Sequence, residues 1–291
     1  MNITQSLTGK PVEFVVLPPI GAPIPREFRA VENNDWLHAA FLTSMQLFRG
    51  EIYLRDGAVR PEHLTTDGRH YLPVDEESWH VLTLNEERKI CACLRLHQER
   101  ALPGFDELPV SGSALGHCPM WRGKLRQAVE TEITAASAAQ IRFGDVGGWA
   151  IAPERRRTLE PLRTILAAYG LAQHLGGFLG IATATCKHGS ATILRKLGLR
   201  PLQADGEDIP VYYDPHYSSE MEVLRFDSRH PNPKYWDWIH ELRLLLSSTT
   251  VVMAQQSLGR ASMFPLPGGR MWVPSPIEPP LRALHACSGS R

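Results

Sequence analysis

The sequence predicts an α/β domain built around a mixed β-sheet, and three observations support this prediction. The chain has 291 residues, of which 43% are hydrophobic, enough for a sizeable core. Residues 79–85 and 89–97 are apolar runs joined by a short charged turn, which is typical of an antiparallel hairpin. Residues 146–152, 159–175 and 178–185 have the patterns of a strand, an amphipathic helix and a second strand, which indicate a parallel crossover.

The elements before the crossover are assigned from hydrophobic periodicity. A helix is expected over residues 31–48, where a helical stripe follows the start signal Asn33-Asn34-Asp35; the stripe consists of Trp36, Ala39, Ala40, Thr43 and Leu47. Residues 49–78 are polar and contain Gly and Pro, so we expect a long loop with at most one short strand. A second helix is expected just before the crossover, with one apolar stripe made of Leu125, Val129, Ile133 and Ala136.

After the crossover, a short helix is expected to end at Gly198, because glycine commonly ends helices. Residues 209–213 and 220–226 are the expected final strands, and residues 232–248 form a strongly apolar amphipathic helix that could cover the sheet as a lid. The chain then divides into three parts. These are a proline-rich surface arm (1–26), the main domain (27–229) and a C-terminal helical extension with a tail (230–291).

Composition and charge exclude several classes of function. Lys and Arg together number 31, as do Asp and Glu, so the net charge is zero and the chain is not expected to bind nucleic acid. Since no apolar run reaches transmembrane length, stable membrane insertion is not expected. The five cysteines lack paired C-x-x-C spacing, so we expect reduced thiols, no metal site and a cytoplasmic protein; they are Cys91, Cys93, Cys118, Cys186 and Cys287.

The turn Glu154–Thr158 holds three consecutive arginines between the first crossover strand and its helix. The first amides of a helix have no partner inside the helix, and together with the helix dipole they favour an anion. Arg155, Arg156 and Arg157 add positive charge at that point, so the turn is a candidate anion site. The alternative is that three surface arginines are merely solvated.

The stretch IAPERRRTLEPL resembles the donor-binding turn of the GNAT acyltransferases, with Pro153 and Arg156 on the family's proline and arginine. The segment ending in Gly198-Leu199-Arg200-Pro201 is similar to the family's next strand and short helix, apart from a missing aromatic. The resemblance covers roughly residues 31–226. It implies a GNAT-like α/β fold whose mixed central sheet is splayed between two parallel strands, with helices on both faces.

Several positions depart from the GNAT pattern. Arg157, Leu159 and Pro161 stand where the family has the glycines that let coenzyme A approach the backbone, and Leu194 stands where it usually has a general-acid tyrosine. These departures weigh against a standard acetyl-coenzyme A enzyme.

Further stretches resemble two groups with this fold, the autoinducer (acyl-homoserine-lactone) synthases and the long-chain N-acyl amino acid synthases. LTSMQLFRGEIYLRDG is similar to their first helix, and VDEESWHVLTLNEERKICACLRL to their acidic turn and hairpin, which ends in an arginine, here Arg95. GDVGGWAIAP lies where the autoinducer synthases have E-[LI]-S-R-x-x-V, with Asp145 for the Glu and Gly148 for the Arg. YYDPHYSSEMEVLRFDSRHPNPKYW resembles the C-terminal segment of the N-acyl amino acid synthases.

The resemblance implies an N-acyltransferase that moves a fatty acyl group from acyl carrier protein to the amino group of an amino acid. The donor would be the 4′-phosphopantetheine thioester of the carrier protein, and no permanently bound cofactor is implied. An arginine-rich turn suits the single phosphodiester of such a donor. Two alternatives stay open: an N-acetyltransferase that uses acetyl- or acyl-coenzyme A, and a non-catalytic GNAT-like protein that binds an acyl chain or carrier protein.

The reaction class directs the choice of candidate residues, because amide formation needs a base near the amine and donors for an oxyanion. The predicted catalytic residues are Asp145, on the acidic position of the related enzymes, and His188, just after the second central strand. The predicted donor-binding residues are Ile151, Arg155, Arg156, Arg157 and Thr158. Gly147, Gly148 and Trp149 are predicted to shape the oxyanion site and the acyl passage. Arg95, Glu222 and Arg225 are predicted to bind the acceptor.

Each of these residues also has a purely structural interpretation. Asp145 could be solvated at the start of a strand, His188 could be structural, and Gly147-Gly148 could form a β-bulge. Arg225 could form an internal salt bridge with Asp227 or Glu222, since a charge at the end of an apolar strand needs a partner.

Overall fold

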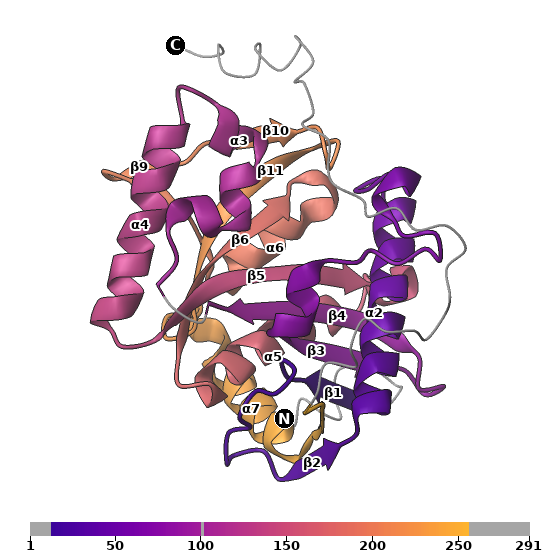
Figure 1. Cartoon of the computed structure of the whole chain (residues 1–291). Helices are drawn as coiled ribbons and strands as arrows, with labels where there is room; N and C mark the ends of the chain where they lie inside the picture. The colour runs from indigo at the N-terminus through magenta and orange to yellow at the C-terminus, as the bar shows by residue number, and fades with distance from the viewer. Residues whose placement is uncertain (1–12, 100–101, 256–291) are drawn as a thin grey trace.

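The computed structural model describes residues 13–99 and 102–255, and these form a mixed β-sheet covered by helices (Figure 1). The strand order is β10-β11-β6-β5-β4-β3-β1-β12-β2, and β7 pairs with β11. The strands are β1 (Glu13–Leu17), β2 (Ala30–Asn33), β3 (Ser78–Leu84), β4 (Ile90–Gln98), β5 (Arg142–Ile151), β6 (Phe178–Thr185), β7 (Arg200–Pro201), β10 (Tyr212–Asp214), β11 (Ser219–Asp227) and β12 (Thr250–Met253). A separate two-stranded sheet contains β8 (Gln203–Ala204) and β9 (Glu207–Asp208).

Helices cover both faces of the sheet (Figure 1). One face packs against α2 (Asp35–Arg55) and against α4 (Arg122–Ala138), which follows the short α3 (Ala114–His117). The opposite face packs against α5 (Glu160–His174), and both α6 (Ser190–Leu197) and α7 (Trp236–Ser248) pack beside α5. The predicted α/β class, with a mixed sheet and helices on both faces, is therefore confirmed.

The local patterns of the sequence account for most of these elements. Asn34 caps α2 by accepting a hydrogen bond from the backbone N–H of Leu37 at 2.9 Å. The predicted hairpin is present as antiparallel β3 and β4. The predicted stripe of α4 is buried, and Gly198 ends α6 in the left-handed region with φ +119°.

Strand β5 is where the sheet opens. It pairs in parallel with β6 only from Arg142 to Asp145, although β5 continues to Ile151 and β6 to Thr185. On its other side β5 stays paired with β4, where Cys93 pairs with Ala150 but Arg95 pairs with Gly147. One extra residue in β5 between these pairs makes a β-bulge. Beyond Asp145 the two central parallel strands therefore separate, as the resemblance to the GNAT fold implied.

Both ends of the domain differ from the expectation. Residues 13–17, assigned to a surface arm, form β1 inside the sheet, where Val16 and Leu17 are fully buried. Residues 250–253, assigned to the C-terminal extension, form β12, which pairs in parallel with both β1 and β2. Prolines on either side of the short run EFVVL hid β1, because they break the pattern outside a strand without excluding one inside it. The rest of the predicted tail, residues 256–291, lies outside the described residues.

Two helices also differ from the expectation. α2 continues to Arg55, so residues 49–55 belong to a helix and not to the predicted loop. The predicted stripe of α2 is wrong, since Trp36 and Leu47 are exposed; its buried residues are His38, Leu42, Met45, Gln46, Arg49, Gly50 and Ile52. α7 packs against α5 through Ile239, Leu242 and Leu246, on the face away from α2 and α4, so it does not form the lid that we expected over the open sheet.

Candidate active site

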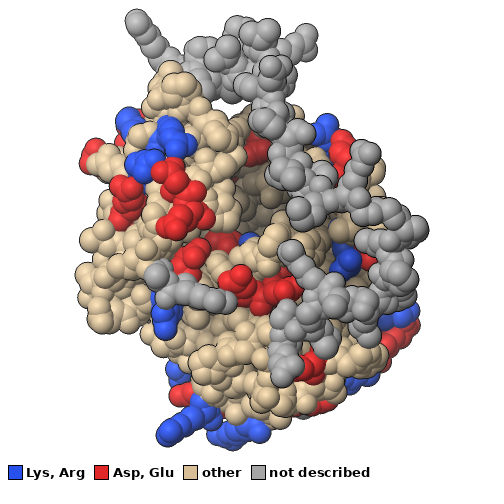
Figure 2. All heavy atoms as spheres, in the orientation of Figure 1, with Lys and Arg blue, Asp and Glu red and all other residues tan. Residues whose placement is uncertain are grey.

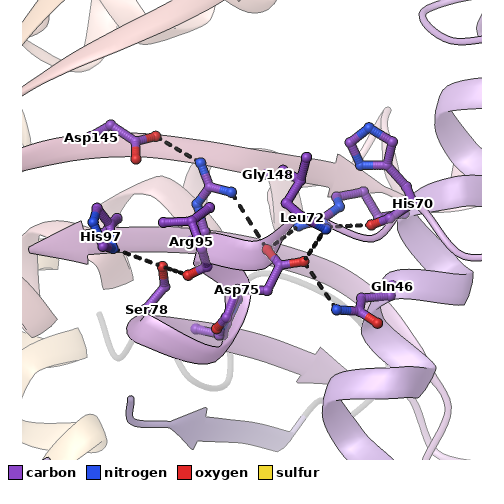
Figure 3. Close-up of polar contacts among 12 residues, drawn as sticks. Gln46, His70, Leu72, Asp75, Ser78, Arg95, His97, Asp145 and Gly148 are labelled. Atoms are coloured by element: carbon purple, nitrogen blue, oxygen red, sulfur yellow. Dashed lines mark hydrogen bonds and ion pairs between the residues drawn. The ribbon is translucent and has the colours of Figure 1, made fainter. Parts of the chain in front are cut away.

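Four charged side chains form a buried network on the face of the sheet between α2 and α4 (Figure 3). Arg49 of α2 donates to both carboxylate oxygens of Asp75, at 3.0 and 2.6 Å. Arg95 of β4 lies 3.5 Å from Asp75 Oδ1 and donates through Nη2 to Asp145 Oδ2 at 2.8 Å. Two guanidinium groups and two carboxylates thus alternate from α2 to β5, and their charges cancel.

The position of Asp75 is fixed from several sides. It lies in the 3-10 turn Pro73–Glu77, accepts hydrogen bonds from Gln46 Nε2 and Leu72 N, and its backbone carbonyl accepts one from His80 Nε2 at 2.8 Å. Burial alone would raise the pKa of Asp75, but the hydrogen bond and charge of Arg49 lower that pKa to about 2. Asp75 is therefore ionised at any pH at which the protein would act.

Two histidines beside this network, His70 and His80, are held neutral. Burial lowers the pKa of His70 to about 3 and that of His80 to about 4, and in both cases the nearby charge of Arg49 acts in the same direction. The backbone carbonyl of His70 accepts a hydrogen bond from Arg49 Nη2. Neutral imidazoles add no charge to the network, so the balance between the two arginines and the two carboxylates is preserved.

Asp145 lies at the edge of the network where β5 and β6 separate. It is the last residue of β5 that pairs with β6, and its side chain is 18% exposed. Its Oδ2 takes the hydrogen bond from Arg95, whereas its Oδ1 has no hydrogen-bond partner among the described residues. A carboxylate oxygen that is shielded from water and unpaired can accept a hydrogen bond from an amine or ammonium group.

A second acidic side chain, Glu99, lies close to Asp145. Burial raises the pKa of Glu99, His97 opposes the shift, and the negative charge of Asp145 adds to it. His97 Nε2 lies 3.5 Å from Glu99 Oε1. A carboxyl group with a raised pKa beside Asp145 could exchange protons with a group bound there.

The bulge in β5 lies just after Asp145. Gly148 has φ +63°, and a Cβ there would lie 3.1 Å from Arg49 Nη1 and 3.2 Å from Arg95 Cβ. The carbonyl oxygen of Trp149 accepts a hydrogen bond from the Tyr53 hydroxyl of α2 at 3.2 Å. The structural alternative for Gly147-Gly148, a β-bulge, is thus present, and α2 holds it in place.

This face of the molecule is hollowed over β6, beside the lobe formed by α3 and α4, and acidic side chains gather below the hollow (Figure 2). Two loops meet close to the network. The rings of His63 and His216 stack with their centroids 4.2 Å apart, one from the segment after α2 and the other from the turn before β11. Burial raises the pKa of the neighbouring Tyr217, and the charges of Arg95 and Arg49 oppose this shift, so this turn lies within reach of the network.

The arginine turn is paired within the protein. Arg156 donates to both carboxylate oxygens of Asp56, at 2.9 and 2.7 Å, and through Nε to the backbone carbonyl of Ile151 at 3.2 Å. Thr158 Oγ1 accepts a hydrogen bond from the backbone N–H of Glu160 at 3.1 Å and donates one to the backbone carbonyl of Arg155 at 2.7 Å, so its hydroxyl is used within the turn. Arg155 is half-buried and Arg157 is exposed, so these two keep their charge near the surface.

The structure brings some of the predicted residues together and keeps others apart. Arg95 contacts Asp145, and Gly147, Gly148 and Trp149 follow Asp145 on the same strand. Nε2 of His188 lies 3.5 Å from the carbonyl oxygen of Asp56, and no hydrogen bond joins His188 to Asp145 within the described ranges. Asp145 and His188 therefore do not form a pair.

The two predicted acceptor residues of β11 lie on opposite faces. Arg225 pairs with Ile181, which in turn pairs with Asp145, so Arg225 is on the Asp145 face; its guanidinium binds Glu132 and Asp227. Glu222 precedes Arg225 by three residues, so its side chain lies on the other face. It is buried, and its Oε1 lies 3.4 Å from Nη1 of Arg195 of α6. The internal salt bridge with Asp227 that we considered for Arg225 is present.

Sequence reasoning did not identify Arg49 and Asp75 as site residues, although they are the most buried charges of the network. Arg49 lies on the buried stripe of α2 with Met45 and Ile52. An arginine at a core position of an amphipathic helix needs a buried carboxylate, and this is the signal that could have identified both. Within the described residues, no group of three or more His, Cys, Asp or Glu could hold a metal ion, and no helix has the length and apolarity needed to cross a membrane.

No protein-family model matches the chain, and no curated protein sequence does. Solved structures do match. The coenzyme A-dependent acyl-homoserine lactone synthase BjaI with MTA is 14% identical, with a TM-score of 0.50 over 84% of this chain and 94% of that one. The same synthase with SAM and isopentyl-CoA matches with a TM-score of 0.49, 14% identity and the same coverage. FeeM, an N-acyl amino acid synthase from uncultured soil microbes, is 12% identical, with a TM-score of 0.38 over 64% of this chain and 84% of that one.

The match to BjaI with MTA extends over nearly the whole synthase although few residues are identical, so it is a match of fold. The opening between β5 and β6 agrees with the splayed sheet that the sequence resemblance implied. This chain has the fold of an acyl-homoserine lactone synthase, and the GNAT-like α/β fold expected from its sequence is confirmed.

Proposed function

We propose that this protein is an N-acyltransferase that moves a fatty acyl group from the phosphopantetheine arm of acyl carrier protein to the amino group of an amino acid. The observation that carries the proposal is the position of Asp145. Its carboxylate stands where β5 and β6 separate, is held by Arg95 and has an unpaired oxygen. An amine bound at Oδ1 would meet a thioester that enters through the opening between the two strands.

The reaction needs no covalent enzyme intermediate. The amine nitrogen attacks the thioester carbonyl while Asp145 accepts the proton that the nitrogen loses. The tetrahedral intermediate then breaks its C–S bond, which gives an amide and a thiolate that takes up a proton to become the free thiol. Beyond Asp145, alternate backbone N–H groups of β5 face the opening and would stabilise the oxyanion.

The start of α5 favours a carrier-protein donor over the diphosphate of coenzyme A. The N–H of Glu160 is taken by Thr158, Pro161 has no N–H, and the carboxylate of Glu160 is fully buried at the helix start. A negative side chain already occupies the region where a helix start would otherwise attract phosphate. A second candidate keeps the same reaction with an acyl-coenzyme A donor, and it is favoured by the coenzyme A-dependent synthase that shares the fold.

The reaction can be tested by mass spectrometry of organic extracts from cells that overproduce the protein. N-acyl amino acids should accumulate with the unchanged chain and disappear with Asp145→Ala. Asp106→Ala is the matched control, because Asp106 is an exposed carboxylate paired with Arg122 and Arg126, and this variant should keep the products. The purified protein should then prefer acyl carrier protein to coenzyme A as donor. A well-expressed protein that yields no new N-acyl product would contradict the proposal.

A further inference from the structure

The residue that follows α2 contacts the segments after both β5 and β6. Asp56 follows α2, and its carboxylate accepts two hydrogen bonds from Arg156, which lies just after β5. Its backbone carbonyl lies 3.3 Å from Lys187 Nζ and 3.5 Å from His188 Nε2, and both of these residues lie just after β6. Asp56 thus contacts the ends of the two strands that separate.

The carboxylate of Asp56 occupies the face of the Arg156 guanidinium that could otherwise bind a phosphate. Nη1 and Nη2 donate to the two carboxylate oxygens in parallel, which is also how arginine binds a phosphate. Nε donates to the carbonyl of Ile151, so the plane of the guanidinium is fixed against the end of β5. A phosphate could bind these nitrogens in the same way only after the carboxylate of Asp56 has left them.

The pair is accessible enough to be exchanged. The side chain of Arg156 is 32% exposed and that of Asp56 is 19% exposed, in contrast with the fully buried pair of Arg49 and Asp75. The pair lies at the surface and is only half-buried, so replacing one anion by another on Arg156 does not disrupt the buried core. Lys187 Nζ contacts the backbone carbonyl of Asp56 and adds a second positive charge near the pair.

We propose that Asp56 is a built-in competitor for the phosphate of the acyl donor and thereby determines donor specificity. This inference rests on the proposed function, since it takes the donor to be a phosphopantetheine thioester. Acyl-coenzyme A must displace Asp56 with its own diphosphate and nucleotide, without the help of a protein surface. A donor attached to a carrier protein gains further contacts from the protein surface, which offset the displacement, so Asp56 selects against free phosphopantetheine thioesters such as acyl-coenzyme A.

Calorimetry with coenzyme A and with pantetheine, which lacks phosphate, tests the inference without turnover. Asp56→Asn keeps the size of the side chain but removes its charge, so it should bind coenzyme A about tenfold more tightly than the unchanged protein, a typical size for coupling between two sites. Its affinity for pantetheine should not change. The double variant Asp56→Asn/Arg156→Gln should lose the gain. Arg88→Gln, at an exposed arginine outside this turn that pairs with Glu13, should leave the affinity of Asp56→Asn unchanged when the two are combined.

Kinetics give a second readout that a purely structural role of Asp56 would not produce. In Asp56→Asn, KM for acyl-coenzyme A should fall, while KM and kcat for a neutral acyl-N-acetylcysteamine thioester should stay the same. An unchanged affinity for coenzyme A, or an equal change for pantetheine, would overturn the inference. If the coenzyme A affinity rises but no N-acyl product is ever formed, the competition stands and the proposed reaction fails, so the two outcomes are distinguishable.

Discussion

Arg49 and Asp75 form an ion pair with both side chains fully buried, and Arg49 Nη2 lies 2.6 Å from Asp75 Oδ2. Taking two charges out of water is costly, and their attraction offsets that cost only when the geometry is good and the remaining polar atoms are satisfied. Here Gln46, Leu72 N and Arg95 supply further contacts to the carboxylate. Because Arg95 also holds Asp145, the pair fixes the place of the proposed base.

Replacing Asp75 should therefore be strongly destabilising. Asp75→Ala leaves the guanidinium of Arg49 buried without its charge partner, and we expect a loss of about 3–5 kcal/mol in the free energy of unfolding, measured by urea denaturation. Glu13→Gln is the control, because the pair of Glu13 and Arg88 is exposed and should contribute less than about 1 kcal/mol. Equal losses of unfolding free energy in the two variants would show that the buried pair stabilises the fold no more than the exposed pair does.

The neutral histidines predict how stability depends on pH. His70 and His80 have folded-state pKa values of about 3 and about 4, below the ordinary 6.5, so below pH 6.5 the unfolded chain binds protons that the folded protein does not. Each then lowers the free energy of unfolding by about 1.4 kcal/mol per pH unit. Urea midpoints should be flat above pH 7 and fall steadily toward pH 5, and His80→Gln should reduce the slope. A midpoint unchanged from pH 7.5 to pH 5 would contradict this.

At lower pH, protonation of Asp75 should remove a further contribution to the free energy of unfolding. The pKa of Asp75 is lowered to about 2, so the stability that comes from its ionised form is present above its ordinary pKa of 3.8 and is lost as pH falls from there toward 2. Urea midpoints of the Asp75→Ala variant should lack this last decrease.

Gly148→Ala should distort the bulge beside Asp145. The residue has φ +63°, which costs about 1–2 kcal/mol for a residue with a Cβ, and the new Cβ would also crowd Arg49 and Arg95. Gly206→Ala separates the two effects, since Gly206 has φ +79° but a Cβ there meets nothing within 4 Å. We expect a clearly larger loss of unfolding free energy for Gly148→Ala. Similar losses would mean that backbone strain alone accounts for the effect.

Arg156→Ala should weaken donor binding more than acceptor binding. The side chain lies at the end of β5 and orients toward Asp56, whereas the network around Asp145 contains no contact with it. KM should therefore rise for acyl carrier protein and stay near its original value for the amino acid. An equal rise in the two KM values would contradict the assignment of Arg156 to the donor site.

The sequence predicted the elements whose signals are local. β5, α5 and β6 follow one another with clear periods, and the observed bounds 142–151, 160–174 and 178–185 lie close to those expected. β1 and β12 were missed because each is only four or five residues long and pairs with strands far away in the chain. A short apolar run gives little periodicity, and its pairing is decided by the rest of the sheet.

The candidate site was predicted only where its residues are close in sequence or match a motif. Asp145, Gly147, Gly148 and Trp149 share one strand, and Arg95 was identified from the end of the next one. Arg49 and Asp75 are 26 positions apart, and Asp56 and Arg156 are 100 apart. Such pairs depend on how helix α2 is placed on the sheet, which no local pattern specifies.

The position of β12 has a consequence for how the protein is made. Within the described residues, strand β2 pairs only with β12, and one edge of β1 pairs with β12 at Val15 and Val16. Residues 30–33 therefore have no strand to join until residues 250–253 exist. During synthesis the growing chain must therefore expose the edge of β1, which is a template for wrong pairing. A chain cut before residue 250 therefore lacks β12, and its sheet keeps an unpaired edge at β1.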